Sequence, residues 1–312
     1  MQVLRGIPER ARQPSVLTIG NFDGVHLGHQ ALLKRLVDAA NARGVDATVL
    51  TFEPHPREYF SPADAPARLA SLREKLLLLA ANGVKRVHVC RFDGHLAAVP
   101  AERFIDDILV RGLDTRHLII GDDFRFGARR QGDFGLLREA GLKHGFEVEA
   151  MHTLELGDQR ISSSAVRNAL LSGNLPLAAR LLGRPYSIAG RVVTGDRLGR
   201  TLGFPTANVQ MKHRKPPLAG VYAVSVEGLA PRHVPGVANV GVRPTVNSNT
   251  RPSLEVHLLD WNQDCYGAHL RVHFLAKQRD EAKFESIDAL SVQIARDAAQ
   301  ARAWFSRNPL HD

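Results

Sequence analysis

The sequence contains little cysteine and no long apolar run. Only Cys90 and Cys265 occur among 312 residues, which excludes a disulfide framework and a paired-cysteine metal site. No stretch approaches the roughly 18 apolar residues that a membrane helix needs. The first residues carry charges without an apolar segment, so we expect no secretory signal. These absences leave a cytoplasmic enzyme as the plain expectation.

Acidic residues are in the minority. Lys and Arg number 41 against 32 Asp and Glu, which gives a formal net charge of +9. Such an excess suits either nucleic acid or a small polyphosphate. The positive residues are scattered, and the densest cluster, Lys212–Lys215, is short. We therefore expect small-molecule substrates, no nucleic acid and no membrane, while monomer and homo-oligomer both stay open.

Apolar runs of strand length alternate with helical periodicity in the first half of the chain. Strands are predicted at 16–20, 46–52, 84–90, 117–121 and 146–151, and helices at 30–41, 72–81, 101–111 and 133–144. This alternation predicts a parallel sheet with helices on both faces. Ligands of such folds bind beyond the carboxyl ends of the strands. Gly20, Phe52 and Gly121 lie at predicted strand ends, so the loops that follow them are candidate binding loops.

The pattern of predicted elements changes in the second half of the chain. Residues 162–183 predict two short helices, and short strands separated by Gly and Pro follow between 186 and 274. This spacing predicts an antiparallel β-barrel, and a last helix near 286–305 has a 3.6-residue apolar period. The expected fold is an α/β doubly wound domain, residues 1–183, followed by a smaller antiparallel β-barrel domain with a C-terminal helix, residues 184–312.

The segment GNFDGVHLGH, Gly20–His29, joins a predicted strand to a predicted helix. The free amides and the dipole of a helix N-terminus attract phosphate, and Gly24 and Gly28 permit close backbone approach. In a first helical turn, His26 and His29 share a face and can stabilise charge on a phosphate. Two alternatives are a metal site, with His55 as a third ligand, and a plain surface turn.

This segment resembles the signature of the HxGH nucleotidylyltransferases, whose two histidines contact the phosphates of ATP. With its NFDG portion it resembles the adenylyltransferase half of the bacterial bifunctional riboflavin kinase/FAD synthetase family. Three further segments are similar to that family: LTFEPHPREYF at Leu50–Phe60, GDDFRFG at Gly121–Gly127 and ISSSAVR at Ile161–Arg167.

The resemblance implies roles for individual residues of the first half. It implies catalytic roles for His26, His29 and Arg167, with the arginine on the leaving pyrophosphate. It implies ATP binding by Gly20, Asn21, Phe22, Asp23, Gly28, Asp123, Ser162, Ser163 and Ser164, and flavin binding by Phe60, Phe124 and Arg125. The structural alternatives are helix capping by the serines and a solvated turn at GDDFRFG.

A second motif, GRVVTGDRLGRTLGFPTAN, spans Gly190–Asn208. The loop residues Gly195, Gly199 and Arg200 suit a phosphate tail. Thr206 and Asn208, two apart on a strand, face the same way and offer the hard oxygens that Mg²⁺ accepts. A polar turn of the barrel is the structural alternative.

The segment LEVHLLD, Leu254–Asp260, places Glu255 and His257 on one face of a strand. Glu255 can accept the proton of a hydroxyl that attacks a phosphoryl group, and a surface ion pair is the alternative. Both motifs resemble riboflavin kinases. That resemblance implies Glu255 as the base for the ribityl 5′-hydroxyl and Arg279 as a flavin contact. It also implies ATP binding by Gly195, Gly199, Arg200, Thr206 and Asn208, the last two with Mg²⁺.

The resemblance runs from about Val16 to Ala301 and implies a bifunctional transferase. ATP would phosphorylate riboflavin to FMN, and a second ATP would adenylylate FMN to FAD with release of pyrophosphate. The flavins are then substrate, intermediate and product rather than a bound redox cofactor. Two other classes stay open: a nucleotidylyltransferase-like domain joined to an RNA-binding barrel, and a flavin carrier or sensor without turnover.

Overall fold

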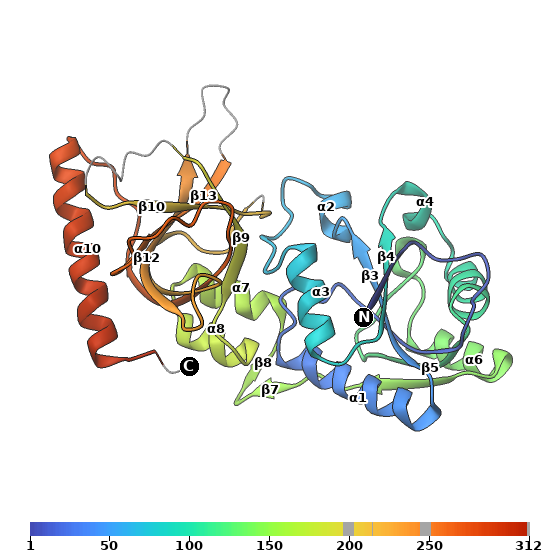
Figure 1. The fold of residues 1–312 in the computed structure, drawn as a ribbon. Coiled ribbons are helices and arrows are strands. Elements are labelled where there is room, and N and C mark those ends of the chain that lie inside the picture. The colour runs from blue at the N-terminus through green and yellow to red at the C-terminus, as the bar shows by residue number, and fades with distance from the viewer. Residues whose placement is uncertain (196–202, 214, 244–250, 311–312) are drawn as a thin grey trace. The chain divides into compact units, whose positions relative to one another are not determined.

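The computed structural model describes residues 1–195, 203–213, 215–243 and 251–310 (Figure 1). The chain forms two compact units, residues 1–66 with 72–162 and residues 67–71 with 163–312. Helices α7 (Ser163–Leu171) and α8 (Leu175–Leu182), which precede the predicted boundary at Gly183, therefore group with the barrel. Among the described residues, no helix is long and apolar enough to cross a membrane.

A parallel sheet of six strands forms the centre of the first unit, which confirms the predicted α/β fold. The strands are β1 (Gln2–Arg5), β2 (Ser15–Ile19), β3 (Asp46–Glu53), β4 (Arg86–Arg91), β5 (Thr115–Gly121) and β6 (Glu147–Met151). Their order is β1-β4-β3-β2-β5-β6, with every neighbouring pair parallel. The edge strand β1 was not predicted, because four largely exposed residues carry no periodic signal.

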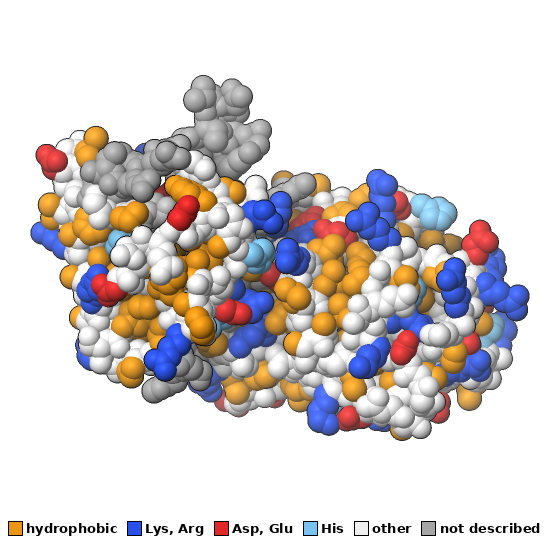
Figure 2. Space-filling view, in the orientation of Figure 1, with side chains coloured by type: hydrophobic (Ala, Val, Ile, Leu, Met, Phe, Trp, Pro, Cys, Tyr) orange, Lys and Arg blue, Asp and Glu red, His pale blue; other side chains and the backbone are white. Residues whose placement is uncertain are grey.

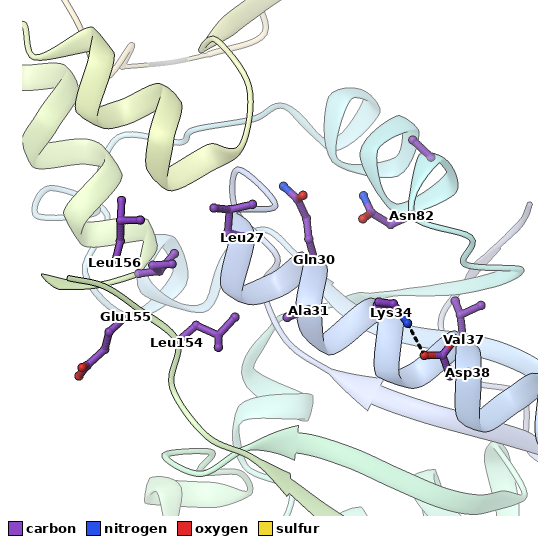
Figure 3. A pocket seen from close by; sticks show the side chains of 12 residues that line it. Leu27, Gln30, Ala31, Lys34, Val37, Asp38, Asn82, Leu154, Glu155 and Leu156 are labelled. Atoms are coloured by element: carbon purple, nitrogen blue, oxygen red, sulfur yellow. Dashed lines mark hydrogen bonds and ion pairs between the residues drawn. The ribbon is translucent and has the colours of Figure 1, made fainter. Parts of the chain in front are cut away.

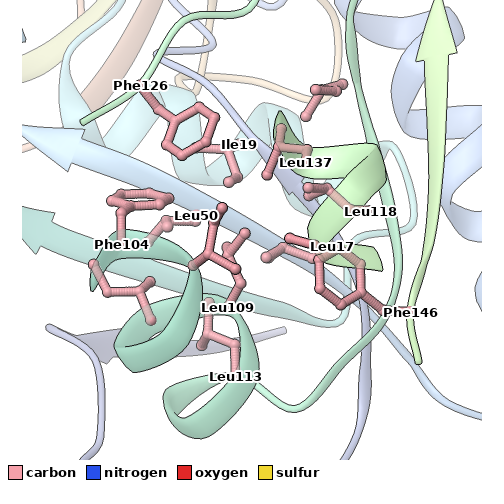
Figure 4. Close-up of a cluster of buried hydrophobic side chains, with 14 of the residues drawn as sticks. Leu17, Ile19, Leu50, Phe104, Leu109, Leu113, Leu118, Phe126, Leu137 and Phe146 are labelled. Atoms are coloured by element: carbon pink, nitrogen blue, oxygen red, sulfur yellow. The ribbon is translucent and has the colours of Figure 1, made fainter. Parts of the chain in front are cut away.

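Helices cover both faces of this sheet, since its central strand β2 is buried at every position. On one face, Val16 belongs to a core with α1 (Leu27–Arg43) and α3 (Leu72–Ala81). On the other face, Leu17 belongs to a core with Leu109 and with Leu137 of α6 (Phe134–His144), shown in Figure 4. The alternation of side chains along the strand thus divides the apolar residues between two layers.

Several short elements complete the first unit. The helix predicted at 101–111 is present as α5 (Ala101–Arg103), which continues into the π-helical segment η1 (Phe104–Gly112). The others are α2 (Pro56–Phe60), α4 (Gly94–Ala97), the 3₁₀ turn η2 (Ala128–Arg130), β7 (Glu155–Leu156) and β8 (Gln159–Arg160). These others are too short for hydrophobic periodicity to reveal.

A closed antiparallel barrel forms the centre of the second unit, as predicted. Its strands are β9 (Ser187–Val193), β10 (Thr206–Gln210), β11 (Gly220–Glu227), β12 (Val234–Arg243), β13 (Arg251–Leu258) and β14 (His269–Arg279). They close in the order β10-β13-β12-β11-β14-β9. The large side chains Tyr222 and Phe274 are fully buried and pack edge to face, with ring centroids 5.3 Å apart.

The C-terminal helix α10 (Ile287–Arg307) packs on the outer face of the barrel. Ala298 and Ala301 form a small core with Val221 and Val237, so the predicted apolar stripe is buried at Ala298. The first turn of that stripe is not, because Ile287 is 59% exposed.

Candidate active sites

The order of the strands brings two predicted motif segments to one edge of the sheet. From β2 the chain moves outward through β3 and β4 on one side, and β5 and β6 lie on the other. The crevice beyond the carboxyl ends of β2 and β5 is therefore a topological switch point, where open α/β sheets bind ligands. The loop of residues 20–26 leaves β2 there, and the loop of residues 122–127 leaves β5.

His26 is the N-cap of α1. Its backbone is extended, and its Nδ1 accepts a hydrogen bond from the backbone N–H of His29 at 3.3 Å. A neutral imidazole that accepts at Nδ1 carries its proton on Nε2. Capping therefore fixes the tautomer in which His26 offers an N–H donor, at a helix terminus whose dipole favours an anion.

The ring of His29 stacks on that of His26, with centroids 3.7 Å apart and planes 18° apart. Its Nδ1 is shielded from solvent and has no hydrogen-bond partner among the described residues. Burial, and then the neighbouring His26 and Lys75, hold the pKa of His29 well below its ordinary value of 6.5. His29 is therefore neutral at pH 7. A buried polar atom without a partner costs about 1–3 kcal/mol, which is a mark of functional sites.

Gly28 lies close to the ring of His26. A Cβ on Gly28 would lie 3.2 Å from the ring of His26, tighter than ordinary van der Waals contact. The preceding loop is strained, because Phe22 has a φ of 49° and the β-branched Val25 a φ of 41°. Gln30 Nε2 donates to the carbonyl of Val25 at 2.9 Å and holds that loop against α1.

Lys75 is a residue of this site that the sequence did not reveal. It lies on α3 and is only 4% exposed. Its Nζ donates to Thr51 Oγ1 at 3.4 Å, and Thr51 in turn donates to the carbonyl of Asn21 at 3.5 Å. The ammonium thus lies beside the motif loop, close enough to lower the pKa of His29. A lysine in a helix usually lies on the solvated face, so the segment LREKLLLLAA did not predict that Lys75 is buried.

Ion pairs hold the loop that leaves β5. Asp123 accepts from Arg160 at 2.6 Å, and Arg125 Nη1 donates to Asp133 at 3.0 Å. Asp133 is also the N-cap of α6, where its side chain accepts from the backbone of that helix. The two predicted binding residues of this loop therefore have structural contacts as well.

Aromatic rings gather at two places near the predicted flavin-binding residues. Phe124 stacks on Phe126, with centroids 5.7 Å apart. Phe60 is 65% exposed and packs edge to face with Tyr59 at 5.2 Å and with Phe92 at 5.6 Å. An exposed ring supported in this way can stack on a planar ligand.

The serine-rich segment lies at the start of α7. The helix begins at Ser163, so Ser162 precedes it and Ser164 is in its first turn. Arg167, in the next turn, is 9% exposed, and its Nε donates to the carbonyl of Ala67 at 2.6 Å within the second unit. That bond fixes the plane of the guanidinium group.

In the barrel, β10 and β13 bring the predicted kinase residues together. Asn208 is opposite Glu255, and Thr206 is opposite His257. Directly opposed residues of neighbouring strands share a face, so these four side chains line one face of the barrel wall. A Cβ on Gly195 would collide with the side chain of Asn208, so that loop passes directly over it. Gly199 and Arg200 lie outside the described residues.

Asn239 extends this polar row and was not predicted. It lies on β12 opposite Glu255, which is therefore flanked by asparagines on both neighbouring strands. An asparagine within the otherwise apolar segment GVANVG is the signal that could have revealed it.

Arg279 has a carboxylate partner within the barrel unit. Its Nε and Nη2 donate to Asp297 of α10 at 3.0 and 2.7 Å, and its guanidinium lies 5.7 Å from the ring centroid of Phe284. Asp297 is 3% exposed, so this ion pair ties the end of β14 to α10.

A pocket of about 710 Å³ lies beside α1, and Figure 3 shows it. Its lining residues come from α1, the end of α3 and the β7 region: Leu27, Gln30, Ala31, Lys34, Val37, Asp38, Ala81, Asn82, Leu154, Glu155, Leu156 and Ile161. Neither histidine of the motif lines it, so we do not assign the reaction to this pocket.

The sequence left open a metal site in the first unit and a nucleic-acid-binding surface. His55, the third ligand of the metal alternative, is the N-cap of α2, and its Nδ1 accepts from the backbone of Arg57 at 3.1 Å. On the face of the first unit that Figure 2 shows, Lys and Arg are interspersed with Asp and Glu. In that view the described residues form no continuous basic patch of the kind that typifies a nucleic-acid surface.

The HxGH loop lies at the switch point of the sheet, and the polar row lies on a closed barrel. Together they indicate a two-unit transferase that acts on nucleotides. Family models agree: FAD synthetase matches residues 9–165, and riboflavin kinase matches residues 182–305. The chain belongs to the bifunctional riboflavin kinase/FMN adenylyltransferase family.

Individual relatives match over nearly the whole chain. The protein of that name from Escherichia coli K12 is 52% identical, covering 98% of both chains, and that from Pseudomonas fluorescens is 51% identical, covering 97% of both. A crystal structure described as a macrolide-efflux protein from Streptococcus pneumoniae matches with a TM-score of 0.82 and 30% identity. It covers 97% of this chain and 100% of that one.

Proposed function

We propose that each compact unit catalyses one reaction of this family. The barrel unit transfers the γ-phosphoryl group of ATP to riboflavin, which gives FMN and ADP. The first unit transfers AMP from ATP to FMN, which gives FAD and pyrophosphate. The observation that carries the proposal is the placement of the HxGH loop beside the loop after β5 at the switch point of the sheet.

In the adenylyl transfer, a phosphate oxygen of FMN attacks the α-phosphorus of ATP in line, and pyrophosphate leaves. The amides at the start of α1 and the Nε2–H of His26 donate to phosphate oxygens as charge develops on them. His29, held neutral, donates without adding charge, and Lys75 supplies a nearby buried ammonium. No covalent intermediate with the protein is required.

The loop after β5 and the exposed ring of Phe60 bind the flavin ring and the adenine of the substrates. Phe124 and Phe60 offer aromatic faces, and Asp123 and Arg125 offer charged hydrogen-bonding groups. This assignment rests on the family resemblance of the segments together with the exposure of Phe60.

In the kinase reaction, the ribityl 5′-hydroxyl attacks the γ-phosphorus, and Glu255 accepts the proton of that hydroxyl. Thr206 and Asn208 offer a hydroxyl and an amide oxygen on the same face as Glu255, a donor set that suits Mg²⁺. When bound there with ATP, Mg²⁺ neutralises phosphate charge. The backbone at Gly195 lies over Asn208, where it can approach the phosphate tail. Arg279, oriented by Asp297, contacts the flavin.

The test is a time course of the full chain with riboflavin, ATP and MgCl₂, in which chromatography separates FMN from FAD. His29→Ala removes a group of the first unit only, so FMN should accumulate without FAD. Glu255→Gln removes the base of the kinase reaction, so riboflavin should persist, while added FMN should still become FAD. Each variant serves as the control for the other.

Two outcomes would contradict the proposal. If a folded His29→Ala chain lost both activities equally, the two reactions would share one site. If Glu255→Gln phosphorylated riboflavin at the wild-type rate, Glu255 would not be the base. Binding of riboflavin without any product from the wild-type chain would instead favour a flavin carrier.

A further inference from the structure

Three potential metal ligands meet on the outer face of the barrel. Glu227 ends β11, His233 directly precedes β12, and His273 lies on β14. One ligand atom from each lies within 4.8 Å of the others. Val234, next to His233, is five residues along β12 from Asn239, which is about 17 Å at roughly 3.4 Å per residue. The cluster is thus separate from the polar row around Glu255.

The register explains why these side chains converge. Ser225 is opposite His273, and Glu227 is opposite Arg271. Since alternate residues of a strand share a face, these four side chains project together, while Val224 and Val226 are buried on the opposite side. The connection between β11 and β12 then returns His233 to the same place, where its ring stacks on that of His273 with centroids 5.2 Å apart.

The hydrogen bonds in the cluster prepare the ligand atoms. His273 Nε2 lies 3.3 Å from Glu227 Oε2, so an ion bound between these two atoms would replace the proton that joins them. His233 Nδ1 lies 3.2 Å from Ser225 Oγ. A histidine whose Nδ1 is engaged by an outer hydroxyl presents Nε2 as its ligand atom, which is the arrangement of outer partners at metal sites. Ser225 is 3% exposed and therefore well fixed.

We propose that Glu227, His233 and His273 form a binding site for a divalent transition metal, with Zn²⁺ as the ion that the chemistry favours. Two imidazoles and one carboxylate are a common zinc set, with a water completing the tetrahedron. Zinc bonds of about 2.0–2.1 Å place tetrahedral ligand atoms about 3.4 Å apart, so the cluster must contract slightly. His233 is exposed and can move inward. The bound ion would tie the β11–β12 connection to β14.

Arg271 competes with the ion for Glu227. Its Nη1 donates to Glu227 Oε2 at 3.0 Å and to Oε1 at 3.4 Å. Zinc bound at Oε2 leaves the guanidinium on Oε1, and the two cations repel each other. Removal of this guanidinium should therefore tighten the binding of zinc, an effect opposite to that of removing a ligand.

The experiment uses the full chain, stripped of metal with a chelator and titrated with ZnCl₂ in a phosphate-free buffer. Calorimetry and a competing chromogenic chelator give the affinity and the number of ions bound. His233→Ala, an exposed position, should bind one Zn²⁺ fewer per chain, and Ser225→Ala should weaken that site by about tenfold or more. Arg271→Gln should strengthen it. The matched control is His269→Ala, an exposed histidine of the same strand, which should bind as the wild type does.

Two further measurements identify the site. CoCl₂ should give the visible absorption of tetrahedral cobalt with the wild-type chain and not with His233→Ala. Zinc should raise the melting temperature of the wild type more than that of the variant, because an ion that binds only the folded state stabilises it by mass action. Both flavin activities should be unchanged in His233→Ala. Unaltered zinc stoichiometry in both His233→Ala and His273→Gln, or no saturable binding by the wild type, overturns the proposal.

Discussion

Substitution of His26 can separate its structural role from its chemical one. In His26→Ala the cap of α1 is lost, and an N-cap contributes about 0.5–2 kcal/mol to stability. For a unit of this size, about 1 kcal/mol lowers the melting temperature by about 2–4 °C. In His26→Asp the cap is retained, since aspartate is among the best N-caps and its charge suits the helix dipole. The stability of His26→Asp should therefore equal or exceed that of the wild type.

Activity should follow a different order. Both variants lack the Nε2–H donor, and loss of one such donor typically lowers turnover by about 100–1000-fold. His26→Asp also places a negative charge where the phosphates bind, so it should form FAD more slowly than His26→Ala although it is the more stable. Riboflavin phosphorylation by the same molecules is the internal control. The carboxylate should also raise the pKa of His29 relative to the wild type, which an NMR titration measures.

Calorimetry measures the stability of both variants, and the chromatographic assay measures how fast they form FAD. FAD formation by His26→Asp at the wild-type rate would refute the role of the imidazole as donor. A His26→Ala chain as stable as the wild type would refute the capping role that the hydrogen bond to His29 indicates.

Three further predictions concern Lys75, two buried histidines of the first sheet and the unit boundary. Lys75→Met should lower FAD formation by about 100-fold and leave FMN formation intact. Wild-type rates of both reactions in this variant would remove Lys75 from the site. Burial lowers the pKa of His88 and His117, so the fold disfavours their protonated forms. The unfolded chain then binds the extra protons, and the free energy of unfolding should fall below about pH 6.5 by up to ~1.4 kcal/mol per pH unit for each; a flat pH profile of denaturation would contradict this. A fragment of residues 163–312 should be more stable to urea than one of residues 184–312, because α8 packs against β14; equal midpoints would place the boundary at Gly183.

The sequence predicted features that repeat a regular pattern. Strands such as β2 are mostly apolar and buried at every position because both faces of a parallel sheet are covered, and the barrel strands alternate because one face is interior. The loop Gly20–His29 was predictable because glycines, histidines and a helix start occur together. The strand order was not, and only that order shows that the loops after β2 and β5 flank one switch point.

Single long-range contacts escaped the sequence for a physical reason. Lys75 becomes part of the first site only because α3 packs beside β3, and Asn239 joins Glu255 only through the register of β12 with β13. The ion pair of Arg279 with Asp297 likewise depends on where α10 docks. Local periodicity carries no information about partners that are distant along the chain.

The packing of the barrel itself constrains where kinase chemistry can occur. Tyr222, Phe274 and the alternate valines are buried and pack the interior of the barrel. This packing favours ligand binding on the outer face of the barrel. Helix α10 packs against β11, β12 and β14 and covers part of that face. The row formed by Thr206, Asn208 and Glu255 lies on β10 and β13, away from the core that α10 makes. This division of the outer face into a covered apolar part and a polar row supports the proposal that phosphoryl transfer occurs at β10 and β13.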